Sequence, residues 1–118
     1  MPRQSETVEA LSYRTIRELV VNARKHSQAQ TLTVTGRAHD GRLEFIVSDD
    51  GVGFDVERAR DPMQMHGHLG LDTMIERMRL ARGKVDISSS PGHGVRTVFT
   101  MPAAPREAAE AKQPSRQG

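Results

Sequence analysis

Four polar residues near the start of the chain are spaced so that one helix would present them on the same face. They fall at i, i+4, i+7 and i+8: Glu18, Asn22, Lys25 and His26. The amide oxygen of Asn22 is a ligand that Mg²⁺ accepts, and Glu18 can take a proton from a nucleophile. Lys25 can neutralise phosphate charge. The same residues would also suit a solvated helix flank with a Glu18–Asn22 pair.

Glycines cluster where predicted helices and strands end. The clusters are Gly51 and Gly53, Gly67 and Gly70, and Gly92 and Gly94. Glycine admits positive φ and lets a backbone approach a ligand closely. Where Gly70 and Leu71 begin a helix, exposed backbone N–H groups can hold phosphate. Each cluster alone could be a plain turn, but the three clusters with their polar partners together favour a binding site.

Two carboxylates, Asp49 and Asp50, follow directly on an apolar strand. A carboxylate at a strand end can accept the exocyclic amine of adenine, and so distinguish adenine from guanine by its donor and acceptor pattern. Either aspartate can instead form an Asx turn before Gly51.

The residues between these groups predict the elements that position them. Apolar periodicity and turn residues indicate helices over 6–26 and 71–81 and strands over 31–38, 42–48, 84–90 and 95–101. Gly83 stands where a glycine would end the second helix. The order predicts an α+β fold, a two-layer α/β sandwich with helices on one face of a mixed, mainly antiparallel sheet. We expect one domain over 1–102 and a disordered tail over 103–118, which lacks bulky apolar residues.

The composition excludes several other classes of protein. At 118 residues, the chain suffices for one domain, and 3% aromatic residues mean an aliphatic core. The absence of cysteine excludes disulfides and thiolate metal sites. No apolar run approaches the roughly 20 residues of a membrane span, so we expect a cytoplasmic location without direct membrane contact. A net charge of +2 without a basic block does not indicate a nucleic-acid partner.

Four segments resemble the boxes of a known family, the ATP-binding catalytic domain of bacterial two-component sensor histidine kinases. This domain belongs to the Bergerat-fold group with gyrase, the Hsp90 chaperones and MutL. The segments are ELVVNARKHS (18–27, N box), DDGVGF (49–54, first glycine box), GHLGLDTMIERM (67–78, second glycine box) and PGHGVRTVFTMP (91–102, last glycine box). The second glycine box is similar to the form in the nitrate-sensor and membrane-fluidity-sensor subfamily. The resemblance covers about residues 7–102.

The resemblance implies an activity and its partners. It implies a protein histidine kinase catalytic domain that binds ATP and Mg²⁺ for autophosphorylation of a histidine on separate dimerisation helices, upstream of a response regulator. None of the five histidines stands in a phosphoacceptor context. We therefore expect a catalytic domain apart from those helices, monomeric and weakly active or inactive alone.

The resemblance also implies roles for individual residues. Asn22 matches the Mg²⁺ ligand, Glu18 the general base, and Lys25 and His26 the phosphate side of the N box. Asp49 matches the adenine-reading aspartate. The remaining matches are Asp50 beside it, Gly51 and Gly53 under the purine, Gly67, His68, Gly70 and Leu71 at the hinge of the ATP lid, and Gly92 and Gly94 in the last box.

Three features depart from the family pattern. Val95 stands where many relatives carry threonine, so a hydrogen bond or ordered water near adenine can be absent here. Arg82 replaces a glycine that often precedes Gly83, and the lid, about 55–66, is short.

Two other interpretations remain open from the sequence. An anti-sigma-factor-type serine kinase, a protein-binding switch module, would share the fold. A Zn²⁺ site formed by His66, His68 and His93 would use the His-x-His spacing.

Overall fold

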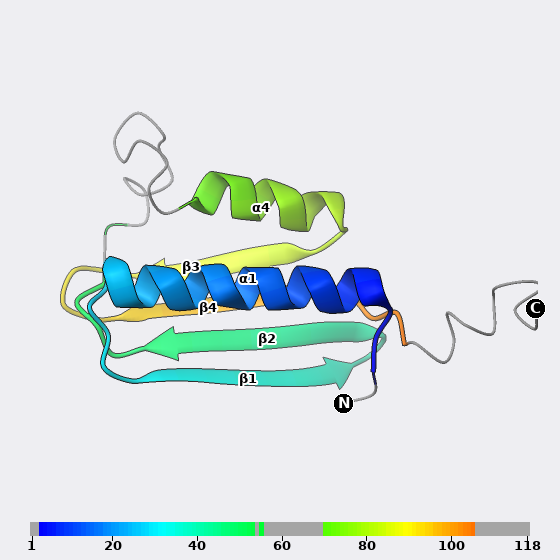
Figure 1. Ribbon diagram of the computed structural model, residues 1–118, viewed down its shortest axis with the longest axis horizontal. Helices are drawn as coiled ribbons and strands as arrows, with labels where there is room; N and C mark the ends of the chain where they lie inside the picture. Colours follow the sequence, from blue (N-terminus) through cyan, green and yellow to red (C-terminus); the bar gives the residue numbers. More distant parts are fainter. Residues whose placement is uncertain (1–2, 54, 56–69, 106–118) are drawn as a thin grey trace, which may run out of the picture.

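The chain folds into two layers, with two helices over one face of a four-stranded sheet (Figure 1). The computed structural model describes residues 3–53, 55 and 70–105. In chain order the elements are α1 (Glu6–Lys25), β1 (Leu32–His39), β2 (Arg42–Asp49), α4 (Leu71–Leu80), β3 (Lys84–Ser89) and β4 (Val95–Pro102). The predicted α+β sandwich is confirmed, and each of its predicted elements is present within one or two residues of its expected bounds.

The sheet has the strand order β1-β2-β4-β3, and its three pairings between described strands are antiparallel. Alternate residues of β4 are buried beneath the helices: Val95, Thr97, Phe99 and Met101. In the register, Thr97 lies between Val47 of β2 and Ile87 of β3. Because side chains alternate between the two faces of a strand, these three residues share the helix-covered face.

The core lies between this sheet face and both helices. Leu19 of α1, Met74 and Met78 of α4, and apolar residues of β2 and β4 form one buried cluster. The ring of Phe99, in this cluster, stacks on that of Phe45, which is partly buried and packs against it, with centroids 5.0 Å apart. Strand β1 is an edge strand whose residues beyond Leu32 are exposed, so it contributes little to this core.

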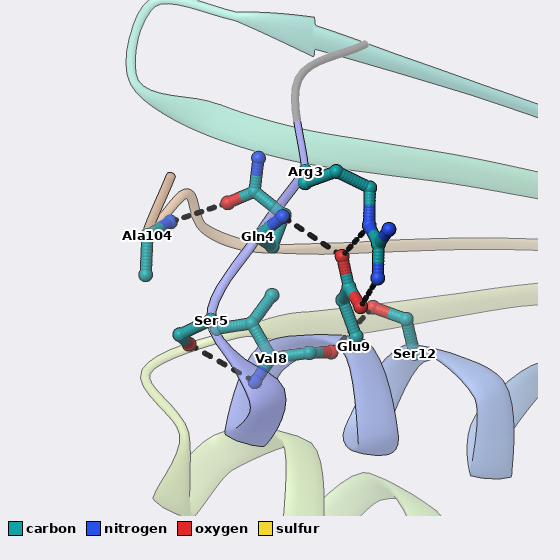
Figure 2. A network of polar contacts seen from close by, with 7 residues as sticks. All are labelled: Arg3, Gln4, Ser5, Val8, Glu9, Ser12 and Ala104. Carbon is teal, nitrogen blue, oxygen red and sulfur yellow. Dashed lines mark hydrogen bonds and ion pairs between the residues drawn. The ribbon is translucent and has the colours of Figure 1, made fainter. Parts of the chain in front are cut away.

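Helix α1 begins at a cap that also holds the two ends of the fold together (Figure 2). Ser5 Oγ accepts a hydrogen bond from the Val8 amide, and the Ser5 amide donates to the Ala104 carbonyl at 2.7 Å. Gln4 Oε1 accepts from the Ala104 amide at 2.6 Å, and the Gln4 amide donates to the Glu9 carboxylate. The first residues of the segment predicted as a tail are therefore bonded to the N-terminal segment, and residues 106–118 lie outside the described residues.

Helix α4 ends in a turn whose left-handed residue is an arginine. The Gly83 amide donates to the Met78 carbonyl at 2.8 Å, and the Arg82 amide to the Arg79 carbonyl at 2.9 Å, which is the Schellman pattern. Arg82 has φ 63° and is the left-handed residue of the turn, and Gly83, which the sequence indicated as the helix-ending glycine, directly follows it. Gly83 is required for space, because a Cβ there would lie 2.4 Å from the Thr100 carbonyl oxygen.

This turn predicts that one substitution should stabilise the protein. Arg82→Gly should raise the free energy of unfolding by about 1 kcal/mol, because a Cβ is disfavoured in the left-handed conformation and glycine has none. Urea denaturation would measure the change. Leu80→Gly, at the last residue of α4, is the control and should lower stability by about 0.8 kcal/mol. A less stable Arg82→Gly protein would contradict the assignment.

Candidate functional site

A pocket opens where the C-terminal half of α1 and the start of α4 lie over the sheet. Its walls are mainly apolar, which is typical of a ligand site with a few orienting polar groups. The apolar lining residues are Leu19, Ala23, Val47, Leu71, Ile87 and Val95, and the polar ones are Asn22, Asp49 and Thr97. The pocket is narrow, and its polar residues lie among apolar ones rather than in open solvent.

A second hollow lies on the open face of the sheet, away from both helices. It is wider, and strand residues line it, among them Arg37, Glu44 and Arg96. No residue that the sequence indicated for chemistry lies there, so the pocket under the helices is the better candidate.

Asp49 is held at the rim of the pocket from two sides. Ser27 Oγ donates to Asp49 Oδ1 at 2.9 Å, and the Gly51 amide donates to the same oxygen at 2.8 Å. The other carboxylate oxygen, Oδ2, has no hydrogen bond from the described residues. The carboxylate is therefore fixed through one oxygen and leaves the other as an acceptor for a ligand.

Ser27 is a site residue that the sequence reasoning missed. It is fully buried, its Oγ accepts from the Gly53 amide at 3.1 Å, and its carbonyl accepts from the Val52 amide at 2.6 Å. In the sequence, Ser27 is the last residue of the N-box segment (18–27) and had no role of its own. The sequence signal that could have indicated this role is a small hydroxyl residue directly after His26, at the end of the helix.

Close packing explains two of the glycines without invoking a ligand. A Cβ on Gly51 would lie 2.1 Å from the Ser27 carbonyl oxygen, and one on Gly94 would lie 2.3 Å from the Asp49 carbonyl oxygen. Gly94 also has φ 67°. These residues let three chain segments meet around Asp49, a structural role that the ligand-approach interpretation did not include.

Among the predicted N-box residues, Asn22 lines the pocket together with Asp49 and is 8% exposed. Lys25 is exposed in the last turn of α1 and does not line it. His26 is the C-terminal cap of α1, and its amide donates to the Asn22 carbonyl at 2.8 Å. The structure thus brings together Asn22 and Asp49, with Lys25 and His26 beyond them at the end of the helix.

The second and last glycine boxes are described in part. Gly70 is the N-terminal cap of α4 with φ 65°, and Leu71 lines the pocket. Gly92 is exposed in the β3–β4 turn, where its amide donates to the Val52 carbonyl. The remaining predicted lid and hinge residues lie outside the described residues: Phe54, residues 56–66, Gly67 and His68.

Glu18 is engaged by cations and is not among the residues lining the pocket. Its Oε1 accepts a hydrogen bond from Arg77 of α4, whose side chain is 18% exposed, and Arg14 Nε lies 3.8 Å from its Oε2. The predicted proton acceptor therefore joins α1 to α4 in this structure. Arg77 stands 59 positions further along the chain in an ordinary helical pattern, so the sequence gave no signal of this pairing.

Asp50 faces the connection between α1 and β1. It is exposed, and its Oδ1 accepts from the Thr31 amide at 2.9 Å and from the Gln30 amide at 3.0 Å. The backbone N–H of Thr31, reinforced by that of Gln30, holds the pKa of Asp50 below its ordinary value. Asp50 is thus a loop anchor, and it does not line the pocket.

The histidine metal site finds no support among the described residues. That part of the chain contains no group of three or more His, Asp or Glu side chains that could hold a metal. His93 is exposed in the β3–β4 turn, and His66 and His68 lie outside the described residues. Within the described ranges, neither helix combines the length and hydropathy that a bilayer crossing requires.

Comparison with known proteins adds independent evidence. The family described as "Histidine kinase-, DNA gyrase B-, and HSP90-like ATPase" matches residues 7–105. The chain is 37% identical over 101 residues to an uncharacterized sensor-like histidine kinase of Chloroflexus aurantiacus, covering 85% of this chain and 17% of that protein. It is 32% identical over 105 residues to the sensor protein NarQ homolog of Haemophilus influenzae, covering 86% and 18%. The chain thus spans less than a fifth of the length of these curated relatives.

A solved structure shows the same fold. The full-length ShkA protein, crystallised in complex with AMPPNP, superimposes with a TM-score of 0.70 at 24% identity. The match covers 89% of this chain and 24% of that one.

The Asp50 contacts predict a pH-dependent contribution to stability. Because the folded-state pKa is lowered, the contribution is complete above the unfolded pKa of about 3.9 and is lost as the pH falls through the folded pKa. Asp50→Asn should therefore lower the urea midpoint at pH 7, and the difference from the wild type should shrink at pH 3. Asp86→Asn, an exposed carboxylate of β3, controls for the loss of one charge. An equal effect of Asp50→Asn at both pH values would contradict this origin.

Proposed function

Because the chain belongs to the family of histidine kinase-, DNA gyrase B- and HSP90-like ATPases, we propose that it binds ATP with Mg²⁺ and supplies the phosphoryl group for a histidine on a separate segment. The family match confirms the family that the sequence resembles. The observation that carries the proposal is Asp49, fixed through Oδ1 at the rim of an apolar pocket with Oδ2 left to accept.

This arrangement suits a purine with an exocyclic amine. Apolar side chains such as Leu19 and Val47 can contact the faces of a flat ring. Asp49 accepts from the amine of adenine, whereas guanine would present a carbonyl oxygen at the corresponding position. A neighbouring fold, that of ShkA, was solved in complex with the ATP analogue AMPPNP, which supports the choice of nucleotide.

The phosphates would extend toward the end of α1 and the start of α4. Asn22 would offer its amide oxygen to Mg²⁺, which neutralises phosphate charge when bound, and Lys25 would add a second positive charge. The backbone amides after Gly70, at the N-terminus of α4, can donate to phosphate oxygens. Positioning and charge neutralisation then favour in-line transfer of the γ-phosphoryl group to an imidazole nitrogen.

Glu18 enters this proposal with a changed role. With Arg77 and Arg14 around its carboxylate, it holds α4 against α1, and so helps to place the first turn of α4 beside the pocket. Glu18 could act as the general base only after its ion pair with Arg77 has separated.

The partners of the proposal follow from the family. They are dimerisation helices carrying the phosphoacceptor histidine and a response regulator, and the isolated domain is proposed to be monomeric, cytoplasmic and weakly active alone. The relatives in the comparison are sensor kinases, which does not favour the anti-sigma-type alternative.

Loss of the Asp49 charge should remove nucleotide binding. Asp49→Asn places an amide where the amine of adenine needs an acceptor, and we expect ATP affinity to fall roughly 100-fold in calorimetry. ATP with Mg²⁺, but not GTP, should raise the melting temperature of the wild type. Asp50→Asn is the matched control and should keep its affinity, because Asp50 bonds only the α1–β1 connection among the described residues. Unchanged ATP affinity in Asp49→Asn would contradict the proposal.

The role proposed for Asn22 is tested by the metal dependence of binding. Asn22→Ala should reduce the gain in ATP affinity that Mg²⁺ gives, and should leave binding in the presence of EDTA close to that of the wild type. Val21→Ala, at the neighbouring exposed position, is the control. An equal loss with and without metal would argue against a ligand role.

A further inference from the structure

The hydroxyl of Thr97 is buried in the pocket without a hydrogen-bond partner. Thr97 is 1% exposed, lines the pocket with Asp49, and its Oγ1 has no partner among the described residues. Other buried hydroxyls of this protein are bonded: Ser12 donates to the Val8 carbonyl, and Thr15 to the Leu11 carbonyl. An unbonded buried hydroxyl destabilises a fold, so its presence at Thr97 calls for a function.

Packing does not account for the hydroxyl. Thr97 is flanked in the sheet by Val47 and Ile87, and Val95 precedes it on the same face of β4. Valine has nearly the same shape as threonine, favours strands equally, and would fill this position without an unbonded polar atom. The hydroxyl is therefore the part of Thr97 that its apolar surroundings do not require.

The position of Thr97 relative to Asp49 indicates what the hydroxyl can recognise. Asp49 pairs in register with Val95, and Thr97 follows two residues later on the same face of the same strand. The two side chains are thus diagonal neighbours across β2 and β4, a separation that a flat ring can span. In adenine, a ring nitrogen that accepts a hydrogen bond lies on each side of the exocyclic amine.

We propose that Thr97 is a second base-reading residue, whose hydroxyl donates to a ring nitrogen beside the amine that Asp49 accepts. The inference rests on the proposed ATP binding. It also explains how the chain manages with Val95, where the sequence resemblance leads one to expect threonine: the hydroxyl is supplied two residues further along β4. If the hydroxyl donates to N1, the same contact excludes guanine and hypoxanthine, which carry N–H at that position; N7 is an acceptor in all three bases.

Substitution can separate the effect of this hydroxyl on the stability of the free protein from its effect on ATP binding. Thr97→Val should leave the melting temperature of the free protein unchanged or higher, because it removes an unbonded buried hydroxyl. It should weaken ATP binding about 5- to 10-fold in calorimetry, the effect of one neutral hydrogen bond. Thr97→Ser, which keeps the hydroxyl, should stay within about twofold of the wild type. Thr15→Val removes a bonded hydroxyl away from the pocket and should leave ATP affinity unchanged.

Analogues of ATP identify the atom that is read. In 1-deaza-ATP and 7-deaza-ATP, carbon replaces one of the two ring nitrogens beside the amine. The wild type should bind one of these analogues more weakly than ATP, and Thr97→Val should bind that analogue and ATP equally.

Three results would overturn the inference. The first is an ATP affinity of Thr97→Val equal to that of the wild type. The second is a loss of affinity for 1-deaza-ATP and 7-deaza-ATP, relative to ATP, that is the same in Thr97→Val as in the wild type. A lower melting temperature of Thr97→Val with unchanged affinity would assign the hydroxyl to the fold instead. If the wild type binds no ATP, or if Asp49→Asn binds it normally, the proposed function itself fails, which these measurements distinguish from failure at Thr97 alone.

Discussion

A single buried hydroxyl, that of Ser27, joins the three chain segments around the pocket. It donates to Asp49 at the end of β2 and accepts from the Gly53 amide in the loop that follows. A hydroxyl can do both at once, which a methyl group or a second carboxylate cannot. The chain of donors runs from Gly53 through Ser27 to Asp49, so one oxygen of the carboxylate is occupied by the protein and the other is left as an acceptor.

The pocket is an extension of the hydrophobic core. Along β4, Phe99 lies in the centre of the core, Thr97 lies at the boundary, and Val95 lies beside Asp49 at the rim. Alternate residues of one strand thus extend from the centre of the core to the pocket. Sites of this kind have little freedom to vary, because a change of volume at the rim also reaches residues that stabilise the fold.

The sequence was informative where a local rule decides the structure. Helical periodicity and the Ser5 cap defined α1, alternation defined the strands, and the order of the glycine boxes indicated which loops meet at the pocket. Local rules could not provide the partners of side chains that are distant in the chain. Ser27 with Asp49, and Glu18 with Arg77, depend on how α1 sits over the sheet and against α4.

Two further differences between the sequence-based expectations and the structure, at Asp50 and Arg82, also have local causes. Asp50 follows Asp49 directly, but adjacent residues of a chain leaving a strand point in different directions, so one lines the pocket and the other anchors a loop. Arg82 takes the left-handed position expected of a glycine because Gly83 is needed for its close approach to Thr100. Sequence alone indicated that a helix ends here but did not indicate which of the two residues turns the chain.

The bonding of Gln4 and Ser5 to Ala104 has a mechanical consequence. It places both ends of the described fold at the start of α1 (Figure 1). The pocket is lined by Leu19, Asn22 and Ala23 and so lies toward the other end of this helix. Helix α1 has 20 residues and is therefore about 30 Å long. A segment attached at either end would therefore contact the domain at the start of α1. A rotation of the domain by about 10° about that point would move the far end of α1 by about 5 Å. Such a rotation would move the pocket as a unit without altering a contact inside it.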